Sequence, residues 1–206
     1  NSKIADLQID LSGGPFHWWK FNLPFISGNI IWSNQTLLLT NVAGHFYNGE
    51  LEGFATFDFS PEAGNDFQFA VTFTNADLSP LVPDLGGKTN QLAGKITGAL
   101  SVTNANTKDM CSWQGFGNIQ LKDGMLWEIP IFGFFAPVLD TMYPNLGSGR
   151  ASNGSATYAI NSCVITTENL QLISPALRMQ YRGSVGFDGS LNTRAEAELL
   201  RNTAVI

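Results

Sequence analysis

The chain has 206 residues, a net charge of -6 and a charged fraction of 14%, so it lacks the clustered Lys and Arg that a nucleic-acid-binding surface needs. Its hydrophobic fraction of 44%, with 15 Phe and 5 Trp, is too high for a disordered chain and is enough to bury a core. No run of about 18 apolar residues occurs, so the sequence predicts no membrane-spanning helix.

The N-terminal third predicts a series of strands and turns. Leu7 to Leu11 alternates apolar and polar residues and stops at Gly13-Gly14-Pro15, which is typical of a strand followed by a turn. An aromatic cluster occupies residues 16–21, and Ile26 to Trp32 predicts the next strand. Asn48-Gly49 then predicts a hairpin turn.

Alternation with a period of two is strictest over residues 51–59 and 67–73, where only Phe54 breaks the pattern. Such strands have one buried and one wet face, as antiparallel sheets allow and parallel sheets generally do not. A meander of hairpins is therefore the simplest topology. The expected fold class is all-β and mainly antiparallel: an elongated curled meander sheet or open groove with one or two short helices.

Residues 75–87 interrupt the strands and predict a short helix or turn. Asp77 or Ser79 would cap its N-terminus, and Gly86-Gly87 would end it. The strand pattern resumes over residues 92–102, and the polar residues 103–109 predict a loop.

The stretch from Trp113 to Pro144 is the main break in the strand pattern. It predicts a strand, a tight Lys122-Asp123-Gly124 turn, a second strand through Trp127 and then an apolar helix. We expect this helix to act as a plug over the apolar face at one end of the sheet. The plug residues fall at helical spacing: Ile131, Phe132, Phe135, Val138, Leu139 and Met142.

The remainder, after a Gly/Ser/Asn connection over residues 145–154 into a last sheet, alternates again as far as Leu199. Residues 31–50 resemble residues 164–183, which suggests two repeat-like halves, 1–109 and 110–206, although chance similarity between two amphipathic hairpins explains the match equally well. The chain starts without a signal-peptide pattern and ends without a natural stop, so we interpret 1–206 as one β-rich segment of a larger protein.

Few residues could carry chemistry. His17 and His45 are the only histidines and belong to no spaced ligand motif, so neither a catalytic triad nor a metal site is expected. Carboxylates such as Glu50 and Glu52 fall on the wet face of strands, and Gly115-Phe116-Gly117 lies inside a strand rather than in a phosphate loop. We therefore predict no enzymatic activity, no metal and no cofactor.

Cys111 and Cys163 have no Cys-x-x-Cys partner, which excludes thioredoxin-like redox chemistry and a four-cysteine zinc site. They are compatible with one disulfide in an oxidising compartment or with two buried thiols. The composition favours buried thiols.

Several motifs follow one another in a specific order from Ala76 onward. They are Asp77-Leu78-Ser79-Pro80-Leu81, Leu92 to Leu100, Gly115 to Leu126, Ile129 to Phe132, Thr166 to Leu172 and Gly183 to Leu191. In this order they resemble the C-terminal region of the AsmA-like proteins, TamB-related proteins of Gram-negative envelopes. The resemblance covers about two thirds of the chain, and the first 60 residues share only the general pattern of strands and turns, without a specific motif.

The resemblance implies a location in the periplasm, a tether to the inner membrane outside this chain, and a β-groove that takes part in phospholipid transfer or outer-membrane homeostasis, with envelope proteins as partners. Phospholipid acyl chains would then be shielded by inward-facing residues. These are Phe57, Phe67, Phe69, Val71, Phe73, Ile96, Leu100, Leu177 and Met179.

Two other functions are considered. The chain could be a structural or assembly module of the envelope with a closed core, which binds partners through its sheet edges. Alternatively, Trp18, Trp19 and Trp32 could form a stacking platform in a carbohydrate-binding β-sandwich.

Overall fold

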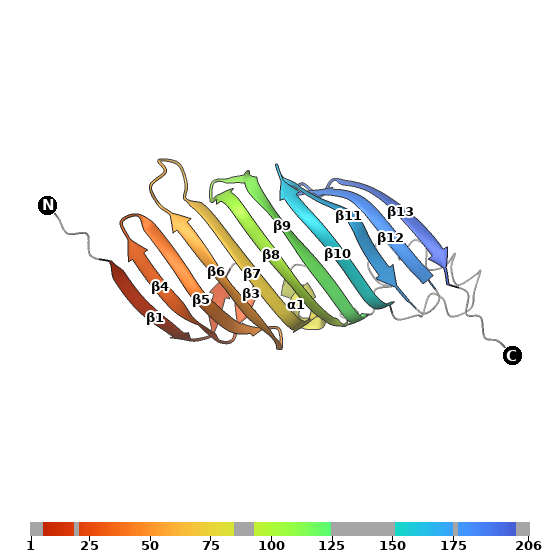
Figure 1. The fold of residues 1–206 in the computed structure, drawn as a ribbon, viewed down its shortest axis with the longest axis horizontal. Coiled ribbons are helices and arrows are strands. Elements are labelled where there is room, and N and C mark those ends of the chain that lie inside the picture. Colours follow the sequence, from red (N-terminus) through yellow and green to blue (C-terminus); the bar gives the residue numbers. More distant parts are fainter. Residues whose placement is uncertain (1–5, 19–20, 85–92, 125–150, 175–176, 201–206) are drawn as a thin grey trace.

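The computed structural model describes residues 6–18, 21–84, 93–124, 151–174 and 177–200. They form one open antiparallel sheet of eleven strands, a separate two-stranded hairpin and one short helix, so the all-β meander is confirmed (Figure 1). The sheet order is β1-β4-β5-β6-β7-β8-β9-β10-β11-β12-β13. Its strands are β1 (Leu7–Gly13), β4 (Ile26–Ser33), β5 (Thr36–Phe46), β6 (Gly49–Asp58), β7 (Asp66–Asp77), β8 (Lys95–Asn106), β9 (Asp109–Gly124), β10 (Ala151–Asn161), β11 (Val164–Ile173), β12 (Leu177–Gly186) and β13 (Leu191–Leu199).

The aromatic cluster near the N-terminus forms the hairpin of β2 (Phe16–Trp18) and β3 (Phe21–Leu23). Helix α1 (Leu78–Asp84) begins directly after Asp77, as predicted, and the alternative cap Ser79 lies inside the helix. The hairpin and the helix lie on one side of the sheet near the ends of its middle strands (Figure 1).

Tight turns join several pairs of neighbouring strands. Tyr47 and Asn48 between β5 and β6, and Ser162 and Cys163 between β10 and β11, all have positive φ angles, between 47° and 64°. Two consecutive residues in this region form the type I′ turn that matches the twist of antiparallel strands. The first of these turns lies one residue before the predicted Asn48-Gly49 pair.

The loop predicted over residues 103–109 is wrong. β8 continues to Asn106 and β9 starts at Asp109, so Thr107 and Lys108 alone make the turn. The polar residues are accommodated because they form hydrogen bonds across the strands: Asn106 Nδ2 donates to Asp66 Oδ1 over 2.7 Å, for example. Polar composition thus marks exposed strand ends here rather than a loop.

Two predicted boundaries on either side of residues 125–150, which lie outside the described residues, are also wrong. The supposed Lys122-Asp123-Gly124 turn is the end of β9, although Asp123 has a φ of 52°. The connection predicted over residues 145–154 overlaps β10, whose Ala151 pairs with Gly124. This pairing keeps β10 in the same sheet instead of a second one. The predicted strand through Trp127 and the whole plug helix lie outside the described residues.

The sheet is continuous across residue 109, where the two predicted halves would meet, since β8 pairs with β9 from Lys95 to Asn106. The division into repeat-like halves stays a prediction.

Candidate functional site: the apolar face of the sheet

A single row of apolar residues crosses all eleven strands, each residue being the backbone partner of the next. We call it the central row. It consists of Ile9, Ile30, Leu39, Ala55, Phe69, Val102, Gly115, Ile160, Ile165, Val185 and Leu191. Because side chains alternate between faces along a strand, the row defines one apolar face of the whole sheet.

The central row is buried in the middle and exposed at both edges. Val102 is only 1% exposed, whereas Ile9 is 44% and Leu191 54% exposed. An apolar row that reaches solvent at both ends leaves surface on which a further apolar group can pack.

The predicted acyl-chain residues share this face. Phe57 pairs with Phe67, which lies two residues before Phe69 of the central row. Each of the other predicted residues whose side chain is described lies an even number of residues from the central-row residue of its own strand, β7, β8 or β12, and therefore projects from the same face. Most of them are half-buried, but Ile96 and Met179 are buried. For Leu177, the structure gives only its backbone pairing with Leu199. The role of the set in lipid binding stays a prediction.

Aromatic rings line the apolar face near the starts of β5 and β7. Trp32 and Phe59 have centroids 5.2 Å apart, and Phe67 meets Trp113 edge to face at 5.4 Å. We call the set the aromatic ladder; it comprises Trp32, Phe57, Phe59, Phe67, Phe69 and Trp113. Its rings pack against one another, which stabilises this end of the face in the absence of any ligand.

The opposite end of the face is covered by the β2–β3 hairpin and α1, which we call the end cover. Its core contains the buried residues Phe46, Tyr47, Ala76, Leu81, Ile96 and Leu121, with Phe21 and Leu78 packed against them. A cover at one end was predicted only from residues 131–142. The hairpin's part in it was missed, although its concentration of aromatic residues was the available signal.

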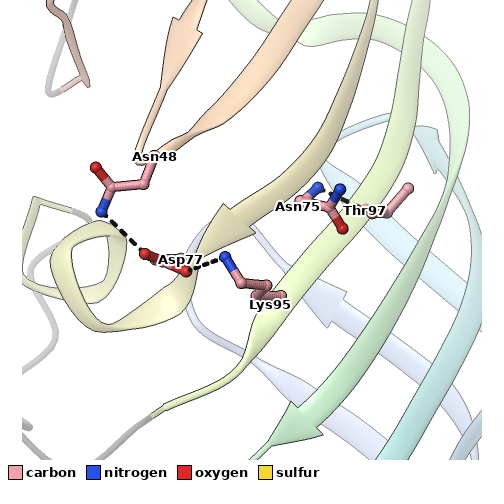
Figure 2. Close-up of polar contacts among 5 residues, drawn as sticks. All are labelled: Asn48, Asn75, Asp77, Lys95 and Thr97. Carbon is pink, nitrogen blue, oxygen red and sulfur yellow. Dashed lines mark hydrogen bonds and ion pairs between the residues drawn. The ribbon is translucent and has the colours of Figure 1, made fainter.

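A polar cluster holds the start of α1 in place (Figure 2). The Asp77 carboxylate accepts hydrogen bonds from Asn48 Nδ2 at 2.9 Å and Lys95 Nζ at 3.0 Å. Beside it, the backbone N–H of Asn75 donates a hydrogen bond to Thr97 Oγ1 at 3.1 Å. The bonds from Asn48 and Lys95 lower the pKa of Asp77. The cluster therefore connects the β5–β6 turn, β7 and β8 at the edge of the end cover.

A second polar contact fixes the far end of α1. The Tyr47 hydroxyl and Asn22 Nδ2 both donate to Asp84 Oδ2. Burial, followed by the bond to Asp84, raises the pKa of Tyr47 to about 12. The end cover is thus attached to the sheet by two sets of polar contacts as well as by apolar packing.

The other face of the sheet is mainly polar, but some apolar side chains project from it, among them the aromatic rings of Phe54 and Phe116. Phe54 is 53% and Phe116 60% exposed. They are joined across the strands by Ala70 and Ser101 in successive backbone pairs. The break in alternation at Phe54 therefore places this ring on the polar face.

This polar face also carries a shallow hollow of about 190 Å³. It is lined by Gln120, Leu121, Lys122, Asn153, Gly154, Ser155, Gln171 and Ile173. None of the predicted acyl-chain residues lines it.

The two cysteines form a disulfide, so the preference for buried thiols is wrong. β9 and β10 pair with Gly115 opposite Ile160, which brings the start of β9 beside the β10–β11 turn. The Cα atoms of Cys111 and Cys163 are 4.4 Å apart there, within the range of disulfides. Composition gives only the average burial of cysteine, whereas the strand register decides which residues meet.

The two histidines lie on different strands, His17 on β2 and His45 on β5. His17 pairs with Asn22 in the hairpin, and the ring of His45 lies 5.9 Å from that of Phe25. Within the described ranges, no group of three or more His, Cys, Asp or Glu residues is arranged to hold a metal ion.

Of the tryptophans predicted as a sugar platform, Trp18 and Trp32 belong to segments at opposite ends of β5. Trp32 pairs with Leu37 at the start of β5, whereas the hairpin that contains Trp18 packs through Phe21 on Phe46 at the end of β5. Trp19 lies outside the described residues.

Comparison with models of protein families, with curated proteins and with solved structures finds no match for this chain. Among the helices of the described part, none has the length and apolar character needed to cross a membrane.

Proposed function

We propose that this chain is a non-enzymatic lipid-binding segment of a cell envelope, which shields phospholipid acyl chains on its apolar face while the headgroups stay in solvent. The observation that carries the proposal is the central row, which crosses eleven strands and is exposed at both edges. The end cover would limit how far an acyl chain can extend along the strands.

The energetic reason is the cost of exposing an acyl chain to water. At about 0.8 kcal/mol per methylene, a chain of about 15 carbons resists leaving an apolar environment by roughly 12 kcal/mol. A protein surface that accepts the chain lowers this barrier, and a row that continues from strand to strand offers it a path.

The proposed setting is the periplasm, with a tether to the inner membrane outside this chain. The resemblance to AsmA-like proteins supports it, and the Cys111–Cys163 disulfide is compatible with an oxidising compartment.

Site-specific photo-crosslinking tests the proposal. A photoreactive phenylalanine analogue is placed at Ile9 or Val185 on the central row, and at Phe116 on the polar face as a matched control. Val185 is 41% and Phe116 60% exposed, so solvent access alone does not favour the central row. We expect phospholipid adducts from Ile9 and Val185 and few from Phe116.

Equal labelling at all three positions, or no phospholipid at any of them, would contradict the proposal. Native mass spectrometry of the protein as purified from cells provides an independent measurement, since a bound phospholipid adds its own mass.

A structural or assembly function is the second candidate, and the aromatic ladder favours it because those rings already pack on one another. It predicts a protein that is free of lipid and is captured with an envelope protein partner after cross-linking in cells.

A further inference from the structure

Among the described residues, β13 is the last strand of the sheet, and no described strand pairs with its outer edge. Every residue of β13 is exposed, and β13 is the terminal strand of the sheet order. Proteins usually protect such edges with proline, lysine or a bulge. β13 contains neither proline nor lysine, its charged residues Arg194, Glu196 and Glu198 all project from one face, and it pairs with β12 without a register shift.

The two faces of β13 differ in character. Leu191, Ala195 and Leu199 share the apolar face, since Leu191 ends the central row and the others follow at even spacing. Arg194 and Glu196 project from the polar face. A strand added at this edge must match both faces to extend the sheet.

The charges on the polar face are incompletely balanced. Arg194 is the direct backbone partner of Arg182, and like charges in opposite positions destabilise a strand pair. Glu196 Oε1 lies 3.4 Å from Arg194 Nε and 3.9 Å from Arg182 Nη2, so a single carboxylate forms ion pairs with two guanidinium groups. A carboxylate of a neighbouring strand on the open side of Arg194 would give this guanidinium a second partner.

We propose that two copies of the chain pair through β13, antiparallel and related by a two-fold axis at Ala195. Ala195 then faces Ala195 of the second copy, and Leu191 faces Leu199 of the second copy. Arg194 faces Glu196 of the second copy, and the symmetry forms this pair twice. The apolar face continues without interruption from one copy into the other.

Charge favours this register among those that keep the apolar residues on one face, because only an axis at Ala195 places Arg194 opposite Glu196. Moving the axis to Arg194 or to Glu196 places two identical charges opposite each other. The edge strand β1 offers no comparable complementarity, because its one charged residue, Asp10, already accepts a hydrogen bond from Asn29 Nδ2 at 2.7 Å. Pairing β1 with β13 of another copy would be a head-to-tail contact, which produces rings or open filaments instead of a symmetric dimer.

Disulfide trapping tests the register. The chain has two cysteines and both are in the native disulfide, so Ala195→Cys introduces a single free thiol. Across the proposed axis the two thiols belong to directly opposed residues, within disulfide range. In Thr193→Cys, the matched control, they are separated by four residues, about 13 Å along the strands. We expect a covalent dimer from Ala195→Cys and little from Thr193→Cys.

Charge reversal tests the proposed ion pairs. Arg194→Glu and Glu196→Arg should each weaken dimerisation about tenfold, measured as the dissociation constant by sedimentation equilibrium. The double variant R194E/E196R restores opposite charges and should recover most of the loss. Circular dichroism establishes that each variant is folded.

Three results would overturn the proposal: a chain that stays monomeric up to about 100 µM, a concentration at which weak pairing is readily detected; equal cross-linking of the two cysteine variants; or no recovery in the double variant. Oligomers that keep growing with concentration, instead of stopping at a dimer, would also contradict the proposal and would indicate head-to-tail pairing of β13 with β1. The inference does not depend on lipid binding.

Discussion

Tyr47 donates a hydrogen bond from its hydroxyl to the carboxylate of Asp84, across 37 residues of sequence. Tyr47 belongs to the tight turn between β5 and β6, and Asp84 is the last residue of α1. The bond therefore connects the end cover to the sheet at a partly buried position. Burial and this bond raise the pKa of Tyr47 to about 12.

The raised pKa predicts a loss of stability at high pH. The contribution of Tyr47 is fully present below its unfolded-state pKa of about 10 and declines as the pH rises from about 10 to 12. Tyr47→Phe removes the titrating group and one hydrogen bond to a carboxylate, so we expect it to be less stable by about 1–2 kcal/mol at pH 7. Urea unfolding across this range should show the difference between the two proteins shrinking above pH 10. A constant difference would contradict the assignment.

The lowered pKa of Asp77 predicts the opposite pH dependence. Its charged form is stabilised by the bonds from Asn48 and Lys95, so its contribution is present above its unfolded-state pKa of about 3.9 and is lost as the pH falls through the lower folded-state value. The side chains of Asp77 and Lys95 are partly exposed, which limits the effect to below about 1 kcal/mol. Asp77→Asn should reduce stability at pH 7 by that amount and make unfolding less sensitive to pH below 4. Lys95→Met, which removes only the ion pair, is the matched control and should show a smaller loss.

Removal of the disulfide should destabilise the sheet. The bond closes a loop with a sequence separation of 52, for which chain entropy gives about 4 kcal/mol, with about 2–4 kcal/mol typical of measurements. We expect the double variant Cys111→Ser, Cys163→Ser to unfold at a lower urea concentration by that free energy. Reduced wild-type protein should behave like the double variant, and the variant itself should be insensitive to reductant. A variant as stable as the oxidised protein would contradict the pairing.

Burial along the central row predicts unequal costs of truncation. Val102 is 1% exposed, so Val102→Ala should cost about 2 kcal/mol through lost burial and the cavity left behind. Leu191 is 54% exposed, and Leu191→Ala should cost less than about 1 kcal/mol although it removes more atoms. Chemical denaturation of both variants measures the contrast. Similar losses would show that the middle of the row is less closed than the structure indicates.

The sequence alone determined the features that depend on neighbouring residues. Alternation over residues 51–59 and 67–73 predicts strands with one apolar face, and α1 begins after Asp77, where the strand pattern ends. Even the exception at Phe54 could be read locally, since its ring projects from the polar face. The wrong loop at 103–109 shows the limit, because polar residues in exposed strand ends look like a loop when their cross-strand partners are unknown.

Only the tertiary structure decided how distant segments align. The register brings eleven residues from eleven strands into the central row, places Cys111 beside Cys163, and sets the β2–β3 hairpin against Phe46. None of these follows from local periodicity, because a shift of one residue between two strands would invert every face beyond it. The physical reason is that register is fixed by the sum of many cross-strand contacts and turn geometries along the sheet, whereas a strand is specified by its own alternating residues.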